Sequence, residues 1–291
     1  MMTLPNRNDL CWCGSGKKYK KCHLAFDEKL DFLARQGVHV PDHEMIKTPA
    51  QIAAIKESCQ INTAVLDHVA AHIAVGMSTE EVNRLVHDKT LELGGIPAPL
   101  DFEGFPKSTC TSINDEVCHG IPSEDIILRS GDIVNVDVST IYNGYFSDAS
   151  RMFMLGDVSE ERRRLVEATK ECLDRGLAAA QAWGFTGDIG EAVQTYAESL
   201  GYSVVKELGG HGVGIAFHEE PFICHQGRRG TGTLLVPGMI FTIEPMINAG
   251  TAKVKVNEAN GWTVSTKDGK DSAQWEYTVL ITEDGPEILT Y

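Results

Sequence analysis

Two acidic residues inside apolar, strand-forming runs are the first sign of chemistry in this sequence of 291 residues. Asp137 and Asp148 interrupt two β-branched segments joined by Asn143-Gly144, a dipeptide typical of two-residue β-hairpin turns. A turn there would place Ser139 opposite Asp148 and make Asp137 the diagonal neighbour of Asp148 on the same face. Two carboxylates at that separation repel each other unless a cation lies between them. The hairpin therefore predicts a bound metal ion.

Five further polar residues interrupt apolar or glycine-rich stretches. They are His119, His211, His218, Glu244 and Glu276. A single histidine is more often a surface residue or a hydrogen-bonded core residue, so the acids decide the interpretation. The two acids of this group and the two of the hairpin all lie in strand-like or aromatic runs, where an unpaired charge is expensive to bury. Four buried carboxylates and one imidazole are a suitable ligand set for two divalent cations with mixed oxygen and nitrogen ligands.

A second cluster of metal-binding residues lies near the N-terminus. Its side chains supply three thiolates and one imidazole, a tetrahedral set suited to structural zinc, from Cys11, Cys13, Cys22 and His23. The alternative is a disordered basic tail with incidental cysteines. Four lysines between the second and third cysteines form a local basic face that would suit ribosomal RNA or an acidic partner, although a run of charges is more often a solvated face. They are Lys17, Lys18, Lys20 and Lys21.

Composition limits the functions that remain. A hydrophobic content of 42% allows a large buried core, which excludes a disordered protein. A net charge of −15 argues against a general binder of nucleic acid or of anionic membranes. No stretch is long and apolar enough to span a bilayer, and residues 1–10 lack the apolar core of a signal peptide. We expect a cytoplasmic monomer whose eight cysteines are thiols or metal ligands rather than disulfides.

The elements that position these residues divide the chain into three parts. The zinc cluster defines a module of residues 1–25, a linker of residues 26–47 follows, and a large domain covers residues 48–291. The linker has mixed charges and one short helix near residues 27–35. In the large domain, Pro49 starts a helix with apolar residues at helical intervals. Ser78 or Thr79 starts a second helix, with Glu81 as a capping-box acid, that ends at Gly94.

The large domain also contains an internal repeat. Residues 131–137 match residues 238–244, and residues 76–81 resemble residues 184–189. Each copy reads as two helices followed by strands and ends in an acid, Asp137 or Glu244. Chance similarity of two short pieces is the alternative. A duplicated half with helices packed on one face of an antiparallel sheet is an α+β architecture. The two halves would bring Asp137 and Glu244 together.

Taken together, the motifs of the large domain resemble a type I methionine aminopeptidase, which has the pita-bread fold. The resemblance runs from about residue 46 to the C-terminus. It rests on Cys-His119-Gly-Ile-Pro, the pair Asp137 and Asp148, Gly-His211-Gly-Val-Gly, Phe-His218-Glu-Glu-Pro, Phe-Thr-Ile-Glu244-Pro-Met and Gln-Trp-Glu276. It implies a dinuclear metal-dependent hydrolase that removes the N-terminal methionine from nascent proteins. The active-site ions would be cobalt, manganese, iron or zinc.

The resemblance also implies roles for the ligands. Asp137 would chelate one ion, Asp148 and Glu276 would bridge both, and His211 with Glu244 would complete the second. A water activated by the two ions would attack the first peptide bond, and Glu244 would accept its proton. His218 is placed to hydrogen-bond the oxyanion and His119 the peptide nitrogen beyond the scissile bond. The free amine of the substrate would ligate a metal, which explains an exopeptidase.

A methionine pocket is expected beside the metals, because a thioether packs well against aromatic rings. The residues that match pocket positions of the family are Phe102, Phe105, Cys110, Phe217 and Trp262, with His119 at the edge. Each of them alone is more often plain core. Phe102 and Phe105 stand where the family often has tyrosine, and Pro99 stands where it often has a small residue or cysteine, so the resemblance does not determine fine selectivity.

The N-terminal cluster resembles the SEC-C zinc motif found at the tail of the bacterial secretion motor protein. That resemblance implies a docking tag for a protein partner or the ribosome. Two rival functions remain. A proline-specific peptidase of the same fold would usually carry a large extra N-terminal domain, and a non-catalytic binding protein on this fold would typically lose metal ligands.

Overall fold

The computed structural model describes residues 4–291, so the first three residues of the predicted zinc module and of the segment tested for a signal peptide lie outside it. The α-helices are α1 (Leu24–Arg35), α2 (Pro49–His72), α3 (Thr79–Glu92), α4 (Glu160–Ala179) and α5 (Thr186–Ser199). Short 3-10 turns are η1 (Tyr19–Lys21), η2 (His43–Met45) and η3 (Phe102–Gly104). No described helix is both long and apolar enough to cross a membrane.

The strands form antiparallel sheets of four, five, three and three members. The four-stranded sheet contains β1 (Ile96–Pro97), β2 (Cys110–Ile113), β4 (Ile133–Tyr142) and β5 (Tyr145–Met154). The five-stranded sheet has the order β15 (Gly285–Ile288), β14 (Tyr277–Thr282), β9 (Ile240–Ile243), β7 (Gly210–Gly212) and β8 (Glu219–Ile223). The small sheets join β13 (Ser272–Gln274), β10 (Met246–Asn248) and β6 (Ser203–Val204), and β11 (Val254–Val256), β12 (Val264–Thr266) and β3 (Glu116–Cys118).

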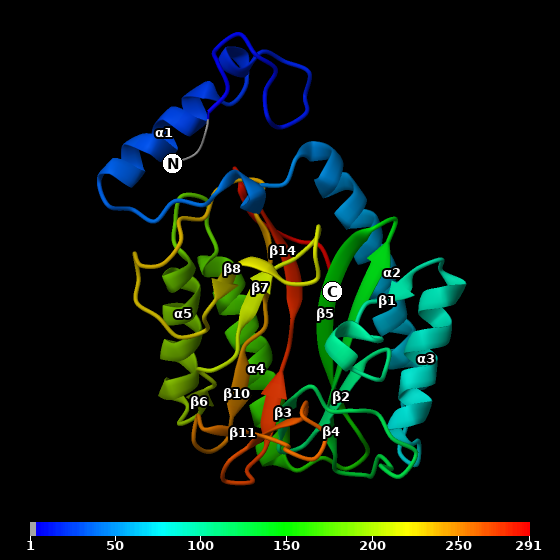
Figure 1. Cartoon of the computed structure of the whole chain (residues 1–291). Helices are drawn as coiled ribbons and strands as arrows, with labels where there is room; N and C mark the ends of the chain where they lie inside the picture. Colours follow the sequence, from blue (N-terminus) through cyan, green and yellow to red (C-terminus); the bar gives the residue numbers. More distant parts are fainter. Residues whose placement is uncertain (1–3) are drawn as a thin grey trace.

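The two pairs of long helices lie on opposite sides of the strands (Figure 1). The helix α2 packs against β4, β5 and α3, whereas α4 packs against α5, β9, β10 and β13. The two larger sheets meet where β5 lies beside β14. There the Thr278 hydroxyl donates to the Asp148 carbonyl oxygen at 2.6 Å, and the Asp148 amide donates back to the hydroxyl oxygen at 3.2 Å. The predicted α+β architecture, with helices over antiparallel sheets, is confirmed.

The hairpin of β4 and β5 has the predicted register. Tyr142 pairs with Tyr145, and Ser139 pairs with Asp148. Asn143 and Gly144 have φ angles of 50° and 81°, the left-handed pair that a tight turn between twisted strands requires. Since alternate residues of a strand share a face, Asp137 and Asp148 point to the same side of the sheet.

The helices begin where the sequence predicts. Pro49 occupies the first turn of α2, and the Thr48 hydroxyl accepts the amide of Gln51 in a capping box. Ser78 caps α3 in the same way with Glu81. The buried face of α2 carries the expected apolar residues, which include Ile55, Cys59, Leu66 and Val69. These caps fix the start of both helices that support the hairpin.

The N-terminal module joins the body through a polar cluster around Asp27. The carboxylate of Asp27 is buried and accepts from Tyr19 Oη at 2.7 Å and Trp12 Nε1 at 3.0 Å, while His43 Nε2 lies 3.0 Å away. The Trp12 ring stacks between His23 and His43, with centroids 4.4 and 4.3 Å apart. These contacts connect the N-terminal cysteine cluster, α1 and η2.

The segment predicted as a linker packs on the core. The helix α1 includes the predicted helical piece at residues 27–35, and Leu30 on it is 2% exposed within the main hydrophobic cluster. Phe26 and Leu33 pack against the same cluster. The boundaries of the module, linker and large domain stay predictions.

Candidate metal centre

One cavity brings together the five predicted metal ligands. It has a volume of about 680 Å³ and lies between the two larger sheets. All four acids and the imidazole that the sequence singled out line it, namely Asp137, Asp148, His211, Glu244 and Glu276. His119 and His218 line it as well. The structure therefore assembles in one place residues that lie up to 157 positions apart, between His119 and Glu276.

Each ligand comes from a strand or its end. Asp137 lies on β4 and Asp148 on β5, Glu244 directly follows β9, and Glu276 directly precedes β14. His211 lies at the centre of the short strand β7 between two glycines. A Cβ atom on Gly210 would overlap the Thr242 carbonyl, and one on Gly212 would overlap the Glu220 carbonyl. The glycines therefore let β7 lie between β8 and β9 with His211 facing the acids.

The ligand atoms lie close enough to share cations. One ligand atom from each of Asp148, His211 and Glu276 falls within 4.8 Å of the others. His211 Nε2 lies 3.7 Å from both Asp148 Oδ2 and Glu244 Oε1. His211 Nδ1 is 2.9 Å from the Gly212 carbonyl oxygen, which places the proton on Nδ1 and leaves the Nε2 lone pair free. The buried Asp137 Oδ1 has no hydrogen-bond partner among the described residues.

The fold disfavours the ionised form of all four carboxylates. Burial raises the pKa of Glu244 to about 8 and that of Asp137 to about 6. The pKa values of Asp148 and Glu276 are raised well above the ordinary range, first by burial and then by the neighbouring acids. Within residues 4–291, no lysine or arginine pairs with any of these four carboxylates. Divalent cations would supply the compensating charge, so the donor set fits a metal pair.

The imidazole of His211 is in the protonation state that a metal ligand requires. Burial, with the neighbouring His218, lowers its pKa to about 4. It is therefore neutral at physiological pH, the form that coordinates metals.

Uncharged neighbours fix the orientation of Glu244. Its two oxygens accept from Thr242 Oγ1 at 2.8 Å and from Gln274 Nε2 at 3.0 Å. Its amide donates to Nε2 of the buried His225 at 3.0 Å. Asp148 is held in the same way by the Ser139 hydroxyl at 2.8 Å. Sequence analysis assigned no role to Thr242, Gln274 or His225: the first two lie inside the quoted motifs, but their contact with Glu244 depends on the fold.

The two outer histidines, His119 and His218, line the same cavity as the acids. The His218 ring is 4.3 Å from the His211 ring and is exposed at the cavity mouth. His119 has a φ angle of 56°, and its ring faces Trp262 with centroids 6.2 Å apart. Burial lowers the pKa of both histidines, so both are neutral at pH 7 and able to donate one hydrogen bond.

Aromatic side chains form an apolar end of the cavity. Phe102 and Phe217 meet edge to face at 4.8 Å, and Phe105 and Trp262 do so at 5.2 Å. Cys110 is buried beside Asp137, its partner across the β2–β4 pair. Every residue predicted for the methionine pocket lines this cavity, and Pro99 lines it too. The apolar end and the acids therefore share one space.

The N-terminal cluster also converges. The ligand atoms of Cys11, Cys13, Cys22 and His23 all lie within 4.8 Å of one another. Cys13 Sγ is 3.5 Å from Cys22 Sγ, and Cys11 Sγ is 3.2 Å from His23 Nδ1. These distances suit one metal ion at the centre of the four ligand atoms, in tetrahedral coordination. All eight cysteines are free thiols.

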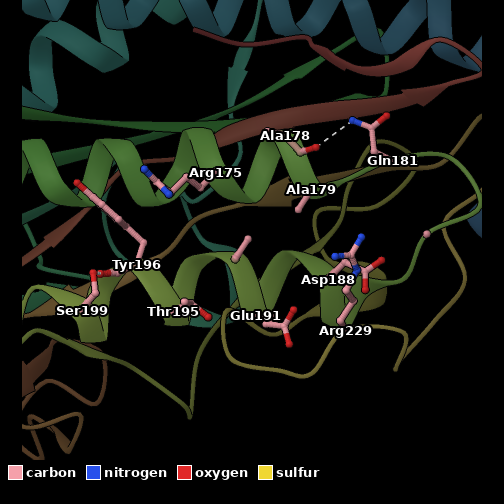
Figure 2. A pocket seen from close by; sticks show the side chains of 12 residues that line it. Arg175, Ala178, Ala179, Gln181, Asp188, Glu191, Thr195, Tyr196, Ser199 and Arg229 are labelled. Carbon is pink, nitrogen blue, oxygen red and sulfur yellow. Dashed lines mark hydrogen bonds between the residues drawn. The ribbon is translucent and has the colours of Figure 1, made fainter.

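A second cavity shares no lining residue with the first. It is a groove of about 740 Å³ between α4 and α5, lined by small residues such as Ala178 and Ala179 (Figure 2). The Arg175 guanidinium covers the Tyr196 ring at 4.1 Å there. The groups of described residues that could hold a metal ion lie elsewhere. Although this groove is slightly larger, the cavity with the acids is the candidate site.

Comparisons with known proteins match both parts of the chain. A model of metallopeptidase family M24 matches residues 53–283, and a model of the SEC-C motif matches residues 7–25. The chain is 44% identical over 287 residues to the methionine aminopeptidase of Chlamydia pneumoniae, with 98% of each chain covered. It is 48% identical over 240 residues to methionine aminopeptidase A of a Synechocystis species, which covers 82% of this chain and 94% of that one.

Solved structures show the same likeness. The crystal structure of methionine aminopeptidase from Rickettsia prowazekii matches with a TM-score of 0.83 and 43% identity. That match covers 84% of this chain and 99% of the other. The chlamydial similarity extends into the N-terminal module, whereas the rickettsial structure matches a smaller share of the chain.

Proposed function

Because the chain belongs to metallopeptidase family M24 and has its pita-bread fold, we propose that it removes the N-terminal methionine from nascent proteins. The observation that carries the proposal is the convergence of three buried carboxylates, the partly buried Asp137 carboxylate and one neutral imidazole in a cavity with an aromatic end. Similarity to methionine aminopeptidases over nearly the whole chain supports the substrate class.

Two divalent ions would be held by the five ligands of the cavity. Asp137 would bind one ion, Asp148 and Glu276 would bridge both, and His211 with Glu244 would bind the other. Bound there, the ions supply a water nucleophile at neutral pH and polarise the scissile carbonyl. Carboxylate-rich sites of this kind accept cobalt, manganese, iron or zinc. Anaerobic metal analysis of freshly isolated protein, with reconstitution of activity, identifies the physiological ion.

Three side chains of the protein would then move or hold protons. Glu244 accepts the proton of the attacking water at a carboxylate oxygen, and Thr242 and Gln274 keep that carboxylate in place. His218 donates a hydrogen bond to the carbonyl oxygen as its negative charge develops. His119 faces the nitrogen of the leaving peptide.

The aromatic end of the cavity would select methionine. A thioether side chain packs well against the edges of Phe102, Phe105 and Trp262 and against the Cys110 sulfur. The free amine of the substrate would ligate a metal at the end of the cavity that holds the acids, and an internal peptide bond offers no such amine. The site therefore suits an exopeptidase.

Peptide turnover tests this function. The metal-loaded protein is expected to release methionine from Met-Ala-Ser and to leave X-Pro peptides largely uncleaved. The difference is expected because the aromatic end fits an unbranched thioether. Released amino acid would be measured for both peptides at equal concentration. Comparable turnover of X-Pro peptides would contradict the proposal and favour a proline-specific peptidase.

The N-terminal module would bind one structural zinc ion and dock the enzyme to the ribosome or a protein partner. Its four lysines between Cys13 and Cys22 are all exposed, and they form a basic face on an otherwise acidic protein. We place the enzyme in the cytoplasm, where nascent chains emerge, and expect it to act as a monomer.

Deleting residues 1–26 is expected to leave peptide turnover unchanged and to weaken association with ribosomes. The first residue along the chain that lines the metal cavity is Pro99, so the deletion removes none of the lining side chains. Turnover of Met-Ala-Ser and co-sedimentation with ribosomes would be measured at low and high salt.

A full-length variant with the four lysines changed to glutamine separates charge from zinc, since it keeps the cysteine cluster. This variant is expected to lose as much ribosome association as the protein that lacks residues 1–26. Unchanged co-sedimentation of the deletion protein would count against a docking role.

A further inference from the structure

A buried ion pair links the segment before α2 to the mouth of the metal cavity. Lys47 has a side chain that is 1% exposed, and its Nζ donates to Glu219 Oε2. Glu219 begins β8 and directly follows His218. Burying two charges costs free energy that hydrophobic side chains of similar volume would avoid, so a role other than stability is worth seeking for this pair.

Lys47 is fixed by its own backbone. Its amide donates to the Gly238 carbonyl oxygen at 2.8 Å, and Ile46 pairs with Met239 in an isolated antiparallel bridge. Thr48, the next residue, caps α2. The ammonium group therefore extends from a backbone that is anchored both to the segment entering β9 and to the start of a long helix.

Glu219 holds the loop between β7 and β8. Its Oε1 accepts the amides of Ile215 at 2.5 Å and Ala216 at 2.9 Å, while its Oε2 faces Lys47. The other end of the loop is fixed where the Phe146 amide donates to the Gly214 carbonyl oxygen at 2.9 Å. One carboxylate thus joins the loop to Lys47.

This loop carries two residues of the candidate site. Phe217 packs on Phe102 at 4.8 Å and lies parallel to Phe146 at 6.0 Å. His218 stacks on Phe217 at 4.4 Å and lies beside His211 at 4.3 Å. His218 is itself exposed and makes no hydrogen bond with another described residue, so its position depends on the loop.

We propose that Lys47 is a positioning residue, which through Glu219 holds the loop of Phe217 and His218 so that His218 reaches the scissile carbonyl. The inference rests on the proposed aminopeptidase function. A displacement of about 1 Å at such a contact can lower a rate by up to about a hundredfold. The ion pair therefore acts on the reaction without touching substrate.

The test is a double-mutant cycle in the full-length, metal-loaded enzyme. Lys47→Met is expected to lower kcat for Met-Ala-Ser about tenfold. In a His218→Ala background the same substitution is expected to change kcat by less than about twofold, because the group that it positions is gone. Hydrogen exchange of the Ile215 and Ala216 amides is expected to become faster in Lys47→Met.

Glu219→Asp tests the same contact with less risk to folding. It keeps the charge but is one methylene too short to reach Lys47 and both amides together, so it is also expected to lower kcat. Lys56→Met is the matched control, because it removes the half-exposed pair with Glu287 and is expected to leave kcat unchanged.

Two failures can be told apart. In the first, the wild-type enzyme turns over Met-Ala-Ser, but the fold losses in kcat of Lys47→Met and His218→Ala multiply in the double variant. The two residues then act independently, so the ion pair is only a structural contact and the inference is overturned. Unchanged exchange of the two loop amides in Lys47→Met would overturn it as well. A wild-type enzyme without aminopeptidase turnover would overturn the proposed function itself, and the positioning role with it.

Discussion

Glu244→Gln is expected to lower kcat for Met-Ala-Ser about a thousandfold, within the range that a general base contributes. The glutamine keeps the size of the side chain and can still bond to Thr242 and Gln274, but its amide cannot accept the proton of the attacking water. Turnover would be measured at saturating substrate together with metal content, since Glu244 is also a candidate ligand.

Two controls make the result specific. Glu171→Gln removes an acid that pairs with Arg175 on α4 and does not line the cavity, and it is expected to leave kcat unchanged. The Glu244→Gln protein should also keep the melting temperature of the metal-free wild type or exceed it, because a buried acid is neutralised. Full peptidase activity of Glu244→Gln would refute Glu244 as the base.

In the metal-free protein, the free energy of unfolding is expected to fall as pH rises. In the metal-free protein the pKa of Glu244 is about 8 and that of Asp137 about 6, both above the ordinary values of 4.5 and 3.8. The folded state therefore binds more protons than the unfolded state between about pH 4 and pH 8. The stability held by the protonated acids is present at low pH and is lost as pH rises through the folded-state pKa values.

Divalent ions should oppose that loss. An ion at a hundredfold excess over its dissociation constant stabilises the fold by about 2.7 kcal/mol, or about 5 to 10 °C in melting temperature for a domain of this size. Because the ions displace protons from the acids, the gap between metal-loaded and metal-free melting temperatures is expected to widen from pH 5.5 to pH 8. Thermal denaturation with manganese or with a chelator measures it.

Two variants test whether the metal-dependent shift in melting temperature arises from ions bound in the cavity. Asp148→Asn is expected to abolish most of the manganese-dependent shift, whereas Cys22→Ser, in the N-terminal cluster, is expected to keep it. Calorimetry in buffers of different ionisation enthalpy should also detect proton release on metal binding at pH 7. The difference between the metal-loaded and metal-free melting temperatures should not narrow as pH rises. A narrowing would contradict the assignment of the raised pKa values to the metal ligands.

The features that sequence analysis predicted are those with a local or repeated pattern. The Asn143-Gly144 turn determines the register of β4 and β5, so the pattern of residues alone places Asp137 and Asp148 on one face. The repeat predicted that Asp137 and Glu244 would meet, and both line the same cavity. Capping boxes likewise predicted the start of α2 and α3.

The features that sequence analysis missed depend on partners far along the chain. Gln274 supports Glu244 from 30 positions away, and Lys47 pairs with Glu219 across 172 positions. A glutamine in a strand or a lysine before a helix carries no mark of such a partner. The packing of α1 was missed for the same reason, since most members of the buried cluster that includes Leu30 come more than a hundred positions later.

The order of the ligands along the chain has a consequence for biosynthesis. Glu276 is the last of the five to be made, and the strand that follows it, β14, pairs with β9 and lies beside β5. A growing chain that stops short of Glu276 holds at most four of the ligands and lacks the strand that joins the two larger sheets. On the proposed function, each molecule would be inactive until its translation has passed that point.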